Sequence, residues 1–410
     1  MRVLLLTQIV PYPPDAGPKV KTWEVIRYLS AAGHEIVLAS FVRPEEEPYL
    51  DTVRQVCAQL HTVPITRSRL ADIGYLLRSQ LTGRPFLVER DDLKAMRTLV
   101  KRIVAQERID IIHADQLTMA QFALPPTNRP ANNWPAVILD AHNAVWTIVE
   151  RMKEMSPWFL RPLIAIEARR VKRYEGRLIN TCDHTLAVTE IDRRALLQAA
   201  ANGSAARQPK ISVIPIAVDS SKLTPIQRTP GSLNILTLGT LHYPPNADGI
   251  RWFFNEVFPL VQQQIPAVTL TIVGKNPPQD FLQADAQNPA IRVTGYVPEL
   301  APYMEEAALM VVPVRAGGGM RVRILEAFSR AMPVVTTTIG LEGIEAQPER
   351  DVLVEDTAPR FAGAVVRLLR DAGLQSRLAA NGRKLIEARY DWQVVLGRID
   401  AIYRELAANR

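Results

Sequence analysis

The sequence predicts an α/β protein with two Rossmann-like domains that face each other across a cleft. The chain has 410 residues, more than one ordinary hydrophobic core accommodates, so two domains of roughly 200 residues each are expected. Both halves open with an apolar strand, a loop rich in glycine and proline, a helix and a second strand. The strands are continuous apolar runs, which is typical of strands buried on both faces of a parallel sheet.

The first half begins with a strand at residues 3–8 and a proline-rich loop at 9–18. A helix follows from about Lys19, and Gly33 suits the left-handed position that ends a helix. The next strand is HEIVLASF. Further strands are expected at residues 109–113, 136–140 and 184–188, with an amphipathic helix at 93–106. The predicted first domain covers residues 1–210.

The second half repeats this order. A strand at 233–239, a proline-rich loop at 242–249, a helix at 249–261 and a strand at 268–274 are expected. The second domain is predicted at residues 211–390. Apolar side chains recur at helical spacing after Trp392, which predicts a C-terminal helix at 391–410 that packs across both domains.

Composition narrows the class of protein. The chain is 47% hydrophobic and 22% charged, as soluble globular proteins are. The N-terminal apolar run is too short for a signal peptide, and no stretch approaches the ~20 apolar residues that span a bilayer. The two cysteines, Cys57 and Cys182, form no metal motif and indicate a reducing compartment. We therefore expect a cytoplasmic protein, at most peripheral at the inner membrane face, without metal, cofactor or nucleic acid.

Residues 151–177 are strongly basic and stand beside Trp158, Phe159 and Leu160. Basic residues interleaved with aromatic ones suit an anionic membrane surface or a polyanionic acceptor. The alternative is an ordinary solvated helix face with a tryptophan in the core.

A triple-glycine turn is the most informative loop. An apolar strand at 309–314 leads into Gly317, Gly318 and Gly319, and a helix is expected from about Met320. Glycines at such a turn let backbone approach a ligand, and the helix start offers unpaired N–H groups. Arg321 and Arg323 would oppose the helix dipole there unless a diphosphate supplies negative charge. The spacing is not that of a P-loop.

Glu326 lies on this helix, away from the apolar stripe that includes Ile324 and Phe328. Two interpretations remain open. It either forms an exposed i,i+4 pair with Arg330, or its carboxylate accepts hydrogen bonds from a ribose.

The segment GGGMRVRILEAFSRAMPVVTT resembles the group 1 glycosyltransferases of family 4, together with LTLGTLHYPPNADGIRWF, LTIVGKNPP and VTGYVPELAPYMEEAALMVVP before it. PYPPDAGPKVKTWEVIRYLSAAGHEIVLASF, VTEIDRRAL and VIPIAVD extend the resemblance over nearly the whole chain. It implies the GT-B fold and retaining transfer of a sugar from a nucleotide-diphosphate sugar.

The resemblance also implies roles for single residues. Glu326 would hold the ribose hydroxyls, Lys275 and Arg321 would neutralise the diphosphate, and Val297 would meet the base through its main chain. Gly17 would approach the diphosphate from across the cleft. The implied donor-binding residues are Gly17, Gly239, Lys275, Val297, Gly317, Gly318, Gly319, Met320, Arg321 and Glu326.

Three departures from the family pattern matter. Gly318 stands where the paired-glutamate motif has its first Glu. The Arg and Lys usual in the loop after the first strand of the second domain are missing, so phosphate binding is expected from Arg321, Arg323 and Lys275. Ile216 and Ala217 replace an Asn-Gly pair. These changes resemble a subgroup associated with exopolysaccharide synthesis, and they leave lost activity open.

The catalytic candidates are Asp115 and His142, which follow the strands DIIH and AVILD and should open on the cleft. Asp115 matches the family by position, and His142 suits acceptor binding or proton transfer. His113, at the end of an apolar strand, is expected to be a structural residue.

The expected function is transfer to a hydroxyl of a glycan or lipid-linked glycan, with domain closure and without metal. A dehydrogenase is excluded because the first loop lacks G-x-G-x-x-G. Two alternatives stay open. One is a nucleotide-sugar epimerase, and the other is a non-catalytic GT-B scaffold, which Gly318 favours. Nothing in the sequence identifies the base, the sugar or the acceptor.

Overall fold

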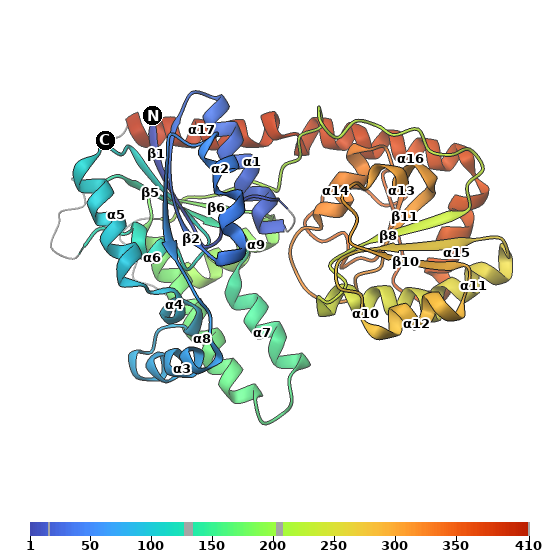
Figure 1. The fold of residues 1–410 in the computed structure, drawn as a ribbon, viewed down its shortest axis with the longest axis horizontal. Coiled ribbons are helices and arrows are strands. Elements are labelled where there is room, and N and C mark those ends of the chain that lie inside the picture. Colours follow the sequence, from blue (N-terminus) through green and yellow to red (C-terminus); the bar gives the residue numbers. More distant parts are fainter. Residues whose placement is uncertain (15–16, 127–133, 202–207, 409–410) are drawn as a thin grey trace. The chain divides into compact units, whose positions relative to one another are not determined.

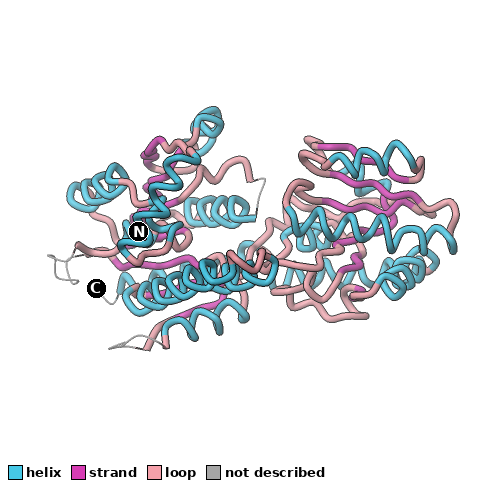
Figure 2. Tube along the Cα trace, turned by 90° about the horizontal axis from the view of Figure 1, so that it is seen from below, coloured by secondary structure: helices cyan, strands magenta, loops and turns pink. Residues whose placement is uncertain are grey.

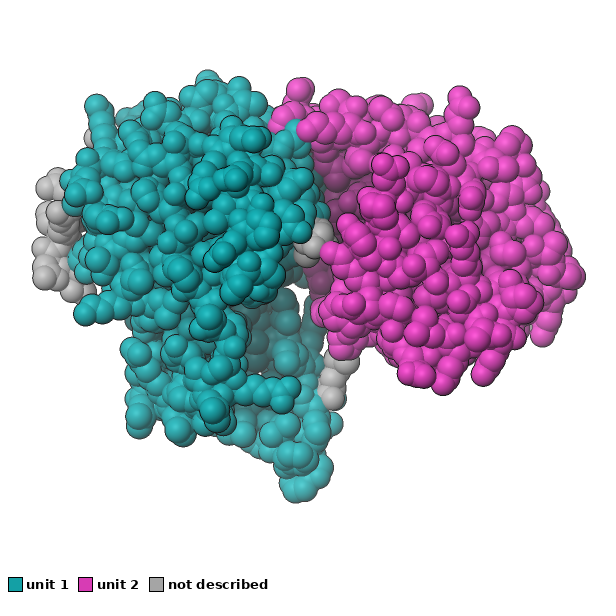
Figure 3. All heavy atoms as spheres, in the orientation of Figure 1, with its two compact units in different colours: residues 1–217, 395–410 teal, residues 218–394 magenta. Residues whose placement is uncertain are grey.

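The computed structural model describes residues 1–14, 17–126, 134–201 and 208–408. The chain divides into two compact units (Figure 3). Unit 1 combines Met1–Ala217 with Val395–Arg410, and unit 2 is Val218–Val394. Each unit contains one parallel sheet flanked by helices (Figures 1 and 2). The predicted class, an α/β protein with two Rossmann-like domains, is confirmed.

Unit 1 has a seven-stranded sheet in the order β3-β2-β1-β4-β5-β6-β7. Its strands are β1 (Arg2–Thr7), β2 (Glu35–Val42), β3 (Gln59–Pro64), β4 (Ile111–Asp115), β5 (Ala136–Ala141), β6 (His184–Ala187) and β7 (Ile211–Val213). The residues of β1, β4 and β5 are almost all buried, as expected for strands covered on both faces.

The helices of unit 1 are α1 (Gly17–Ala31), α2 (Leu50–Arg54), α3 (Arg69–Thr82), α4 (Phe86–Asp91), α5 (Lys94–Gln106), α6 (Ala120–Ala123), α7 (Val145–Met155), α8 (Arg161–Thr181), α9 (Glu190–Ala200) and α17 (Trp392–Ala408). Helix α5 illustrates why these helices pack against the core of unit 1. Its apolar side chains recur at helical spacing and are buried: Met96, Leu99, Val100 and Ile103. No helix of the described residues is long and apolar enough to cross a membrane.

Unit 2 has a six-stranded sheet in the order β10-β9-β8-β11-β12-β13. Its strands are β8 (Asn234–Leu238), β9 (Thr269–Val273), β10 (Ile291–Gly295), β11 (Ala307–Val312), β12 (Val334–Thr336) and β13 (Leu353–Val354). Its helices are α10 (Pro244–Trp252), α11 (Phe258–Gln264), α12 (Gln279–Gln287), α13 (Ala301–Glu306), α14 (Val322–Ser329), α15 (Ala358–Arg370) and α16 (Ala372–Leu385).

The boundaries differ from the predicted ones in three places. Strand β7 pairs with β6, so residues 211–213 belong to the first sheet. The boundary between the units therefore falls later in the chain, between Ala217 and Val218. Helix α10 begins at Pro244, inside the predicted loop, because proline is tolerated in the first turn of a helix. Helix α14 begins at Val322, two positions after the predicted Met320.

The C-terminal helix starts in unit 2 and belongs to unit 1 from Val395 onward. At its start, the backbone N–H of Trp392 donates to the carbonyl of Val218 at 3.0 Å. Farther along, Tyr403 is completely buried, and its hydroxyl lies 2.6 Å from Nδ1 of His113. Asp400 lies 2.8 Å from Nε2 of His34. Helix α17 is therefore an integral part of the first unit.

Candidate active site

The first group of site residues lies at the carboxyl edge of the unit 1 sheet. Strands β1, β4 and β5 are adjacent, and helix α1 begins beyond the end of β1. Strand β4 ends at Asp115, which is in register with Asp140 of β5. His142 directly follows β5. This edge is where parallel α/β sheets bind ligands.

Asp115 and His142, the two predicted catalytic residues, are direct partners. Nε2 of His142 lies 2.7 Å from Oδ1 of Asp115. The hydroxyl of Thr22 on α1 lies 3.1 Å from the same oxygen. A carboxylate held in this way orients an imidazole, so the pair can bind a hydroxyl group or move its proton.

A second, deeper network lies beside this pair. The ammonium group of Lys21 on α1 forms an ion pair with Oδ1 of Asp140, and both side chains are almost fully buried. Nε2 of His113 lies 3.4 Å from Oδ2 of Asp140. The His113 ring therefore bridges Asp140 and Tyr403. This agrees with the expectation that His113 is a satisfied structural residue.

Burial disfavours a charged Asp140, but the charge of Lys21, the hydrogen bond from His113 and the charge of His142 outweigh it. Together they hold the pKa of Asp140 well below its ordinary value. Burial, reinforced by the charge of Asp140, raises the pKa of Tyr403 well above its ordinary value. Asp140 is therefore an ionised carboxylate at neutral pH.

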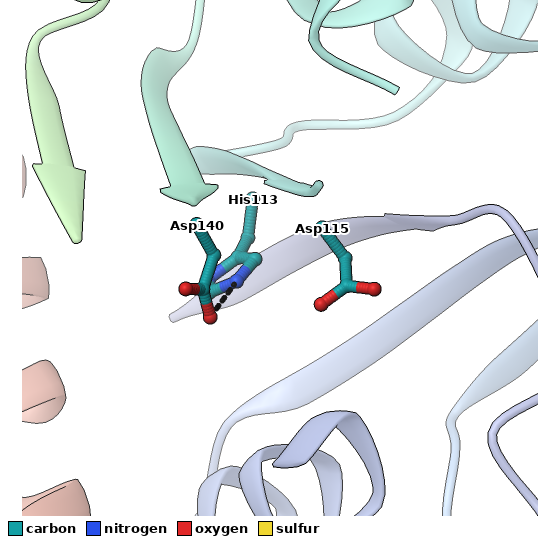
Figure 4. A group of neighbouring side chains, drawn as sticks. All are labelled: His113, Asp115 and Asp140. Carbon is teal, nitrogen blue, oxygen red and sulfur yellow. Dashed lines mark ion pairs between the residues drawn. The ribbon is translucent and has the colours of Figure 1, made fainter. Parts of the chain in front are cut away.

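Ligand atoms of His113, Asp115 and Asp140 lie within 4.8 Å of one another (Figure 4). Such a trio has the donor types of a metal site. Asp140, however, already forms an ion pair with the Lys21 ammonium, and the Asp115 carboxylate already contacts the His142 ring. A buried ammonium on one ligand repels a second cation, and this disfavours a metal ion at these three residues.

Sequence reasoning missed Lys21, Thr22 and Asp140. A signal was present, because Lys21 falls among apolar residues of the first helix and Asp140 ends an apolar strand. Lysine and aspartate are almost never fully buried unless they are paired. The sequence around each residue indicates that it is buried, but only the fold shows that Lys21 and Asp140 form an ion pair.

The second group of site residues is the glycine loop of unit 2, which links β11 to α14. Gly317 and Gly319 have φ angles of 104° and 84°, in the region that favours glycine. A nitrogen of the Arg321 guanidinium donates to the carbonyls of Gly318 and Gly319 at 2.7 and 2.6 Å. Arg321 therefore fixes the loop from within while its charge stays beside the helix start.

Arg323 does not fit the expected role in phosphate binding. Its side chain is half-buried, and its guanidinium donates to the carbonyl of Leu238 and to the side-chain oxygen of Asn246. Burial, helped by the charge of Arg321, lowers the pKa of Arg323 to about 10, while Glu326 raises it. A Cβ on Gly239 would lie 2.9 Å from this guanidinium. Arg323 braces the loop after β8, and Gly239 provides the room.

Glu326 is half-buried, and its carboxylate forms no hydrogen bond or ion pair with any residue that the structure describes. The i,i+4 ion pair with Arg330 is therefore not formed. Burial raises the pKa of Glu326, and the charges of Arg330 and Arg323 act in the opposite direction. A half-buried carboxylate without a protein donor is open to a donor from a ligand.

The remaining predicted residues of unit 2 follow neighbouring strands. Lys275 comes after β9, and its Nζ lies 4.6 Å from the centre of the Tyr296 ring. A Cβ on Gly274 would meet the carbonyl oxygen of Gly239 at 1.8 Å, so the loops after β8 and β9 touch through their backbones. Val297 follows β10, and Met320 is buried in the glycine loop. Gly17 is the first residue of α1, in unit 1.

Comparison with known proteins identifies the family of the chain. Residues 17–222, about half of the chain, match the family described as Glycosyltransferase Family 4. Residues 232–371 match Glycosyl transferases group 1. A 44.6 kDa uncharacterized protein in the cps region of Klebsiella pneumoniae is 26% identical over 173 residues, which are 40% of this chain and 45% of that protein. Glycogen synthase of Mycobacterium tuberculosis is 26% identical over 68% of this chain and 70% of its own length.

Solved structures show the same fold. Sucrose-phosphate synthase from Thermosynechococcus elongatus has a TM-score of 0.69 at 17% identity, with all of both chains covered. HepE from Anabaena, in complex with UDP, has a TM-score of 0.69 at 14% identity and covers 99% of this chain and 100% of its own. The chain belongs to glycosyltransferase family 4 and has the GT-B fold.

Proposed function

We propose that the chain is a retaining glycosyltransferase that moves a sugar from a nucleotide-diphosphate sugar to a hydroxyl acceptor. The observation that carries this proposal is Glu326, a half-buried carboxylate without a described protein partner beside a glycine loop. Two adjacent ribose hydroxyls are the donors that such a carboxylate fits.

The diphosphate is proposed to lie against the glycine loop. The backbone N–H groups of Gly318 and Gly319, the start of α14 and the cations Lys275 and Arg321 all favour negative charge there. Structures of HepE in complex with UDP and with UDP-glucose support a nucleoside diphosphate as the ligand class. Because position 318 is a glycine and not a glutamate, we propose that backbone N–H groups and cationic side chains bind the diphosphate.

The proposed reaction breaks the bond between the sugar C1 and the diphosphate oxygen. Lys275, Arg321 and the helix start stabilise the charge on the leaving diphosphate. The acceptor hydroxyl attacks C1 on the face that the diphosphate leaves, so the configuration is retained. His142, oriented by Asp115 at 2.7 Å, is proposed to hold the acceptor hydroxyl and receive its proton. Protein groups provide the charge stabilisation, so we propose that the reaction needs no metal.

The acceptor is proposed to be a glycan or a lipid-linked glycan in polysaccharide synthesis. The basic residues at 151–177 support a polyanionic acceptor or peripheral contact with an anionic membrane. A cytoplasmic location at the inner membrane face stays a prediction.

The first test is a thermal-shift panel of UDP, GDP and ADP, each with Mg²⁺ and with a chelator. A ligand at about a hundred times its dissociation constant stabilises by roughly 2.7 kcal/mol, a shift of a few degrees. We expect one diphosphate to stabilise the protein equally well in the presence of the chelator. A shift that appears only with Mg²⁺ would refute metal independence, and no shift with any diphosphate would favour the non-catalytic scaffold.

Glu326→Ala tests the proposed ribose contact. It should abolish most of the shift by the active diphosphate and leave the melting temperature of the free protein unchanged. The matched control is Glu256→Ala, since Glu256 is an exposed glutamate of unit 2 outside the proposed site. Equal diphosphate binding by the Glu326 variant and the control would contradict the assignment.

A further inference from the structure

Helix α3 (Arg69–Thr82) has its apolar side turned away from the protein. Leu70, Ile73, Leu77 and Leu81 follow the spacing of one helix face, and all four are exposed. Leu70 is 83% and Leu81 88% exposed. The only side chain of α3 that is buried is Ser79. An ordinary surface helix has the opposite arrangement, with its apolar stripe against the core.

The polar side of α3 is what attaches the helix to unit 1. The hydroxyl of Ser79 donates to the carbonyl of Arg84 at 2.6 Å, and that of Thr82 donates to Glu89 at 2.9 Å. Arg78 forms an ion pair of 2.9 Å with the fully buried Glu89 of α4. These bonds fix the rotation of α3, so the outward direction of its leucines is built in.

A second apolar element lies at the same end of unit 1. Helices α7 and α8 form an antiparallel hairpin, and Figure 1 shows its tip at the end of the unit that α3 occupies. The tip carries Trp158 and Phe159, which are 79% and 59% exposed, and Leu163 is exposed on the first turn of α8. Arg170 of α8 donates to the side chain of Gln80 of α3 at 3.0 Å, so the two elements touch.

The exposed charge on these segments is mostly positive, and one of the arginines, Arg78, is paired with Glu89. Within residues 69–82 and 145–173, the exposed charged side chains that the structure describes are six arginines and two glutamates. The arginines are Arg69, Arg78, Arg151, Arg161, Arg169 and Arg173, and the glutamates are Glu150 and Glu154. Apolar side chains with an arginine border are typical of surfaces that lie in the headgroup region of an anionic bilayer.

We propose that the outward stripe of α3 and the tip of the α7–α8 hairpin form one docking face, which inserts its apolar side chains into the interface of an anionic membrane. The docking face deepens the membrane contact proposed above, because it replaces purely electrostatic attraction by apolar insertion. A soluble polyanion would bind the arginines but would leave the leucines exposed to water, because it has no apolar region to cover them. Two copies of the face packed together would bring their arginines into repulsion.

Vesicle flotation tests the docking face. The probe is a vesicle of phosphatidylcholine with or without phosphatidylglycerol, and the variant is Leu70→Ser/Leu77→Ser/Leu81→Ser. We expect the wild type to float with the anionic vesicles and the variant to lose at least about tenfold in partition coefficient. The control Leu282→Ser removes a leucine of unit 2 that is exposed to 48% and should stay within about twofold of the wild type. Melting curves check that the variants are folded.

Three results would overturn the proposal. The first is equal flotation of the triple variant, which would leave electrostatic contact alone. The second is failure of the wild type to float with anionic vesicles while it binds a soluble polyanion. The third is a wild-type dimer that the triple variant converts to monomer without lipid binding, which would assign the face to a second copy. None of these measurements involves the sugar donor, so the docking face can fail while the proposed transfer stands.

A site-specific label gives an independent measurement. Cys57 is buried and Cys182 is half-buried. Burial raises the pKa of each thiol to about 12, with a further contribution from Asp183 at Cys182, so we expect both to label slowly. An environment-sensitive fluorophore on Leu81→Cys should therefore report that position alone. Its emission should shift to the blue with anionic vesicles, and the same label on Leu282→Cys should not respond. An unchanged emission at position 81 would contradict insertion of α3.

Discussion

The buried ion pair between Lys21 and Asp140 makes a sharp prediction about stability. The side chains of the two residues are only 2% and 1% exposed. Lys21→Met keeps the length of the side chain but leaves the Asp140 carboxylate in the interior without its main counter-charge. Breaking a buried pair by removing one partner costs about 3–5 kcal/mol, because an uncompensated charge stays buried.

The pH dependence has a definite sign. In the wild type the pKa of Asp140 is lower in the folded state, so its stabilisation is present above the unfolded value of about 3.9. It is lost as the pH falls through the lower folded value. In Lys21→Met the largest opposing charge is gone, so burial raises the pKa of Asp140. The cost of the substitution should therefore shrink as the pH falls from neutral toward acid, since protonation removes the buried charge.

The assay must report unit 1 separately, because a chain with two compact units need not unfold in one step. Native-state hydrogen exchange of peptides from β4 and β5 gives the opening free energy of unit 1, and peptides from β8 and β11 give that of unit 2. The control is Arg54→Met, which removes an exposed pair with Asp51 at 2.6 Å and should cost below about 1 kcal/mol. A loss as small as this for Lys21→Met would refute the reasoning.

Three further predictions concern other parts of the molecule. Gly274→Ala places a Cβ 1.8 Å from a backbone oxygen, so it should cost about 1–3 kcal/mol of the free energy of unfolding and lower the melting temperature. The control Gly363→Ala on α15 meets nothing within 4 Å and should not lower it. Burial raises the pKa of Glu175 to about 8, so wild-type stability should fall as the pH rises toward and through that value. Glu175→Gln should remove this slope in melting curves across pH. Asp115→Asn should slow release of the diphosphate at least about a hundredfold and leave diphosphate binding unchanged in the thermal-shift assay.

The fold was largely predictable because its signals are local. The apolar runs that became β1, β5 and β8 predict buried strands in the chain itself, and Glu326 off its apolar stripe indicated an unusual carboxylate. The orientation of α3 was not predictable, since an apolar stripe at helical spacing normally indicates the core. Two side-chain bonds to the segment that follows α3 turn the stripe outward: Ser79 donates to the carbonyl of Arg84, and Thr82 donates to Glu89 of α4. The apolar spacing of the helix does not reveal these bonds.

The sequence predicts where the site residues lie along the sheet, but it does not predict which of them contact one another. Asp115 and His142 were each expected at the carboxyl edge of the sheet, but their contact depends on the order β1-β4-β5, which no local pattern gives. The prediction that Arg323 binds phosphate was wrong for the same reason. Its place in the first turn of α14 favoured phosphate, whereas the fold brings it to Leu238 and Asn246 of distant elements.

The return of α17 to unit 1 has a consequence for synthesis on the ribosome. The last strand of the first sheet is made long before residues 395–408, so unit 2 can fold while unit 1 still lacks Tyr403. Until then His113 has no hydroxyl to meet, and the polar network around Asp140 is open at one side. Of the two units, unit 1 is begun before unit 2 and completed after it, because the helix that closes its core follows unit 2 in the chain.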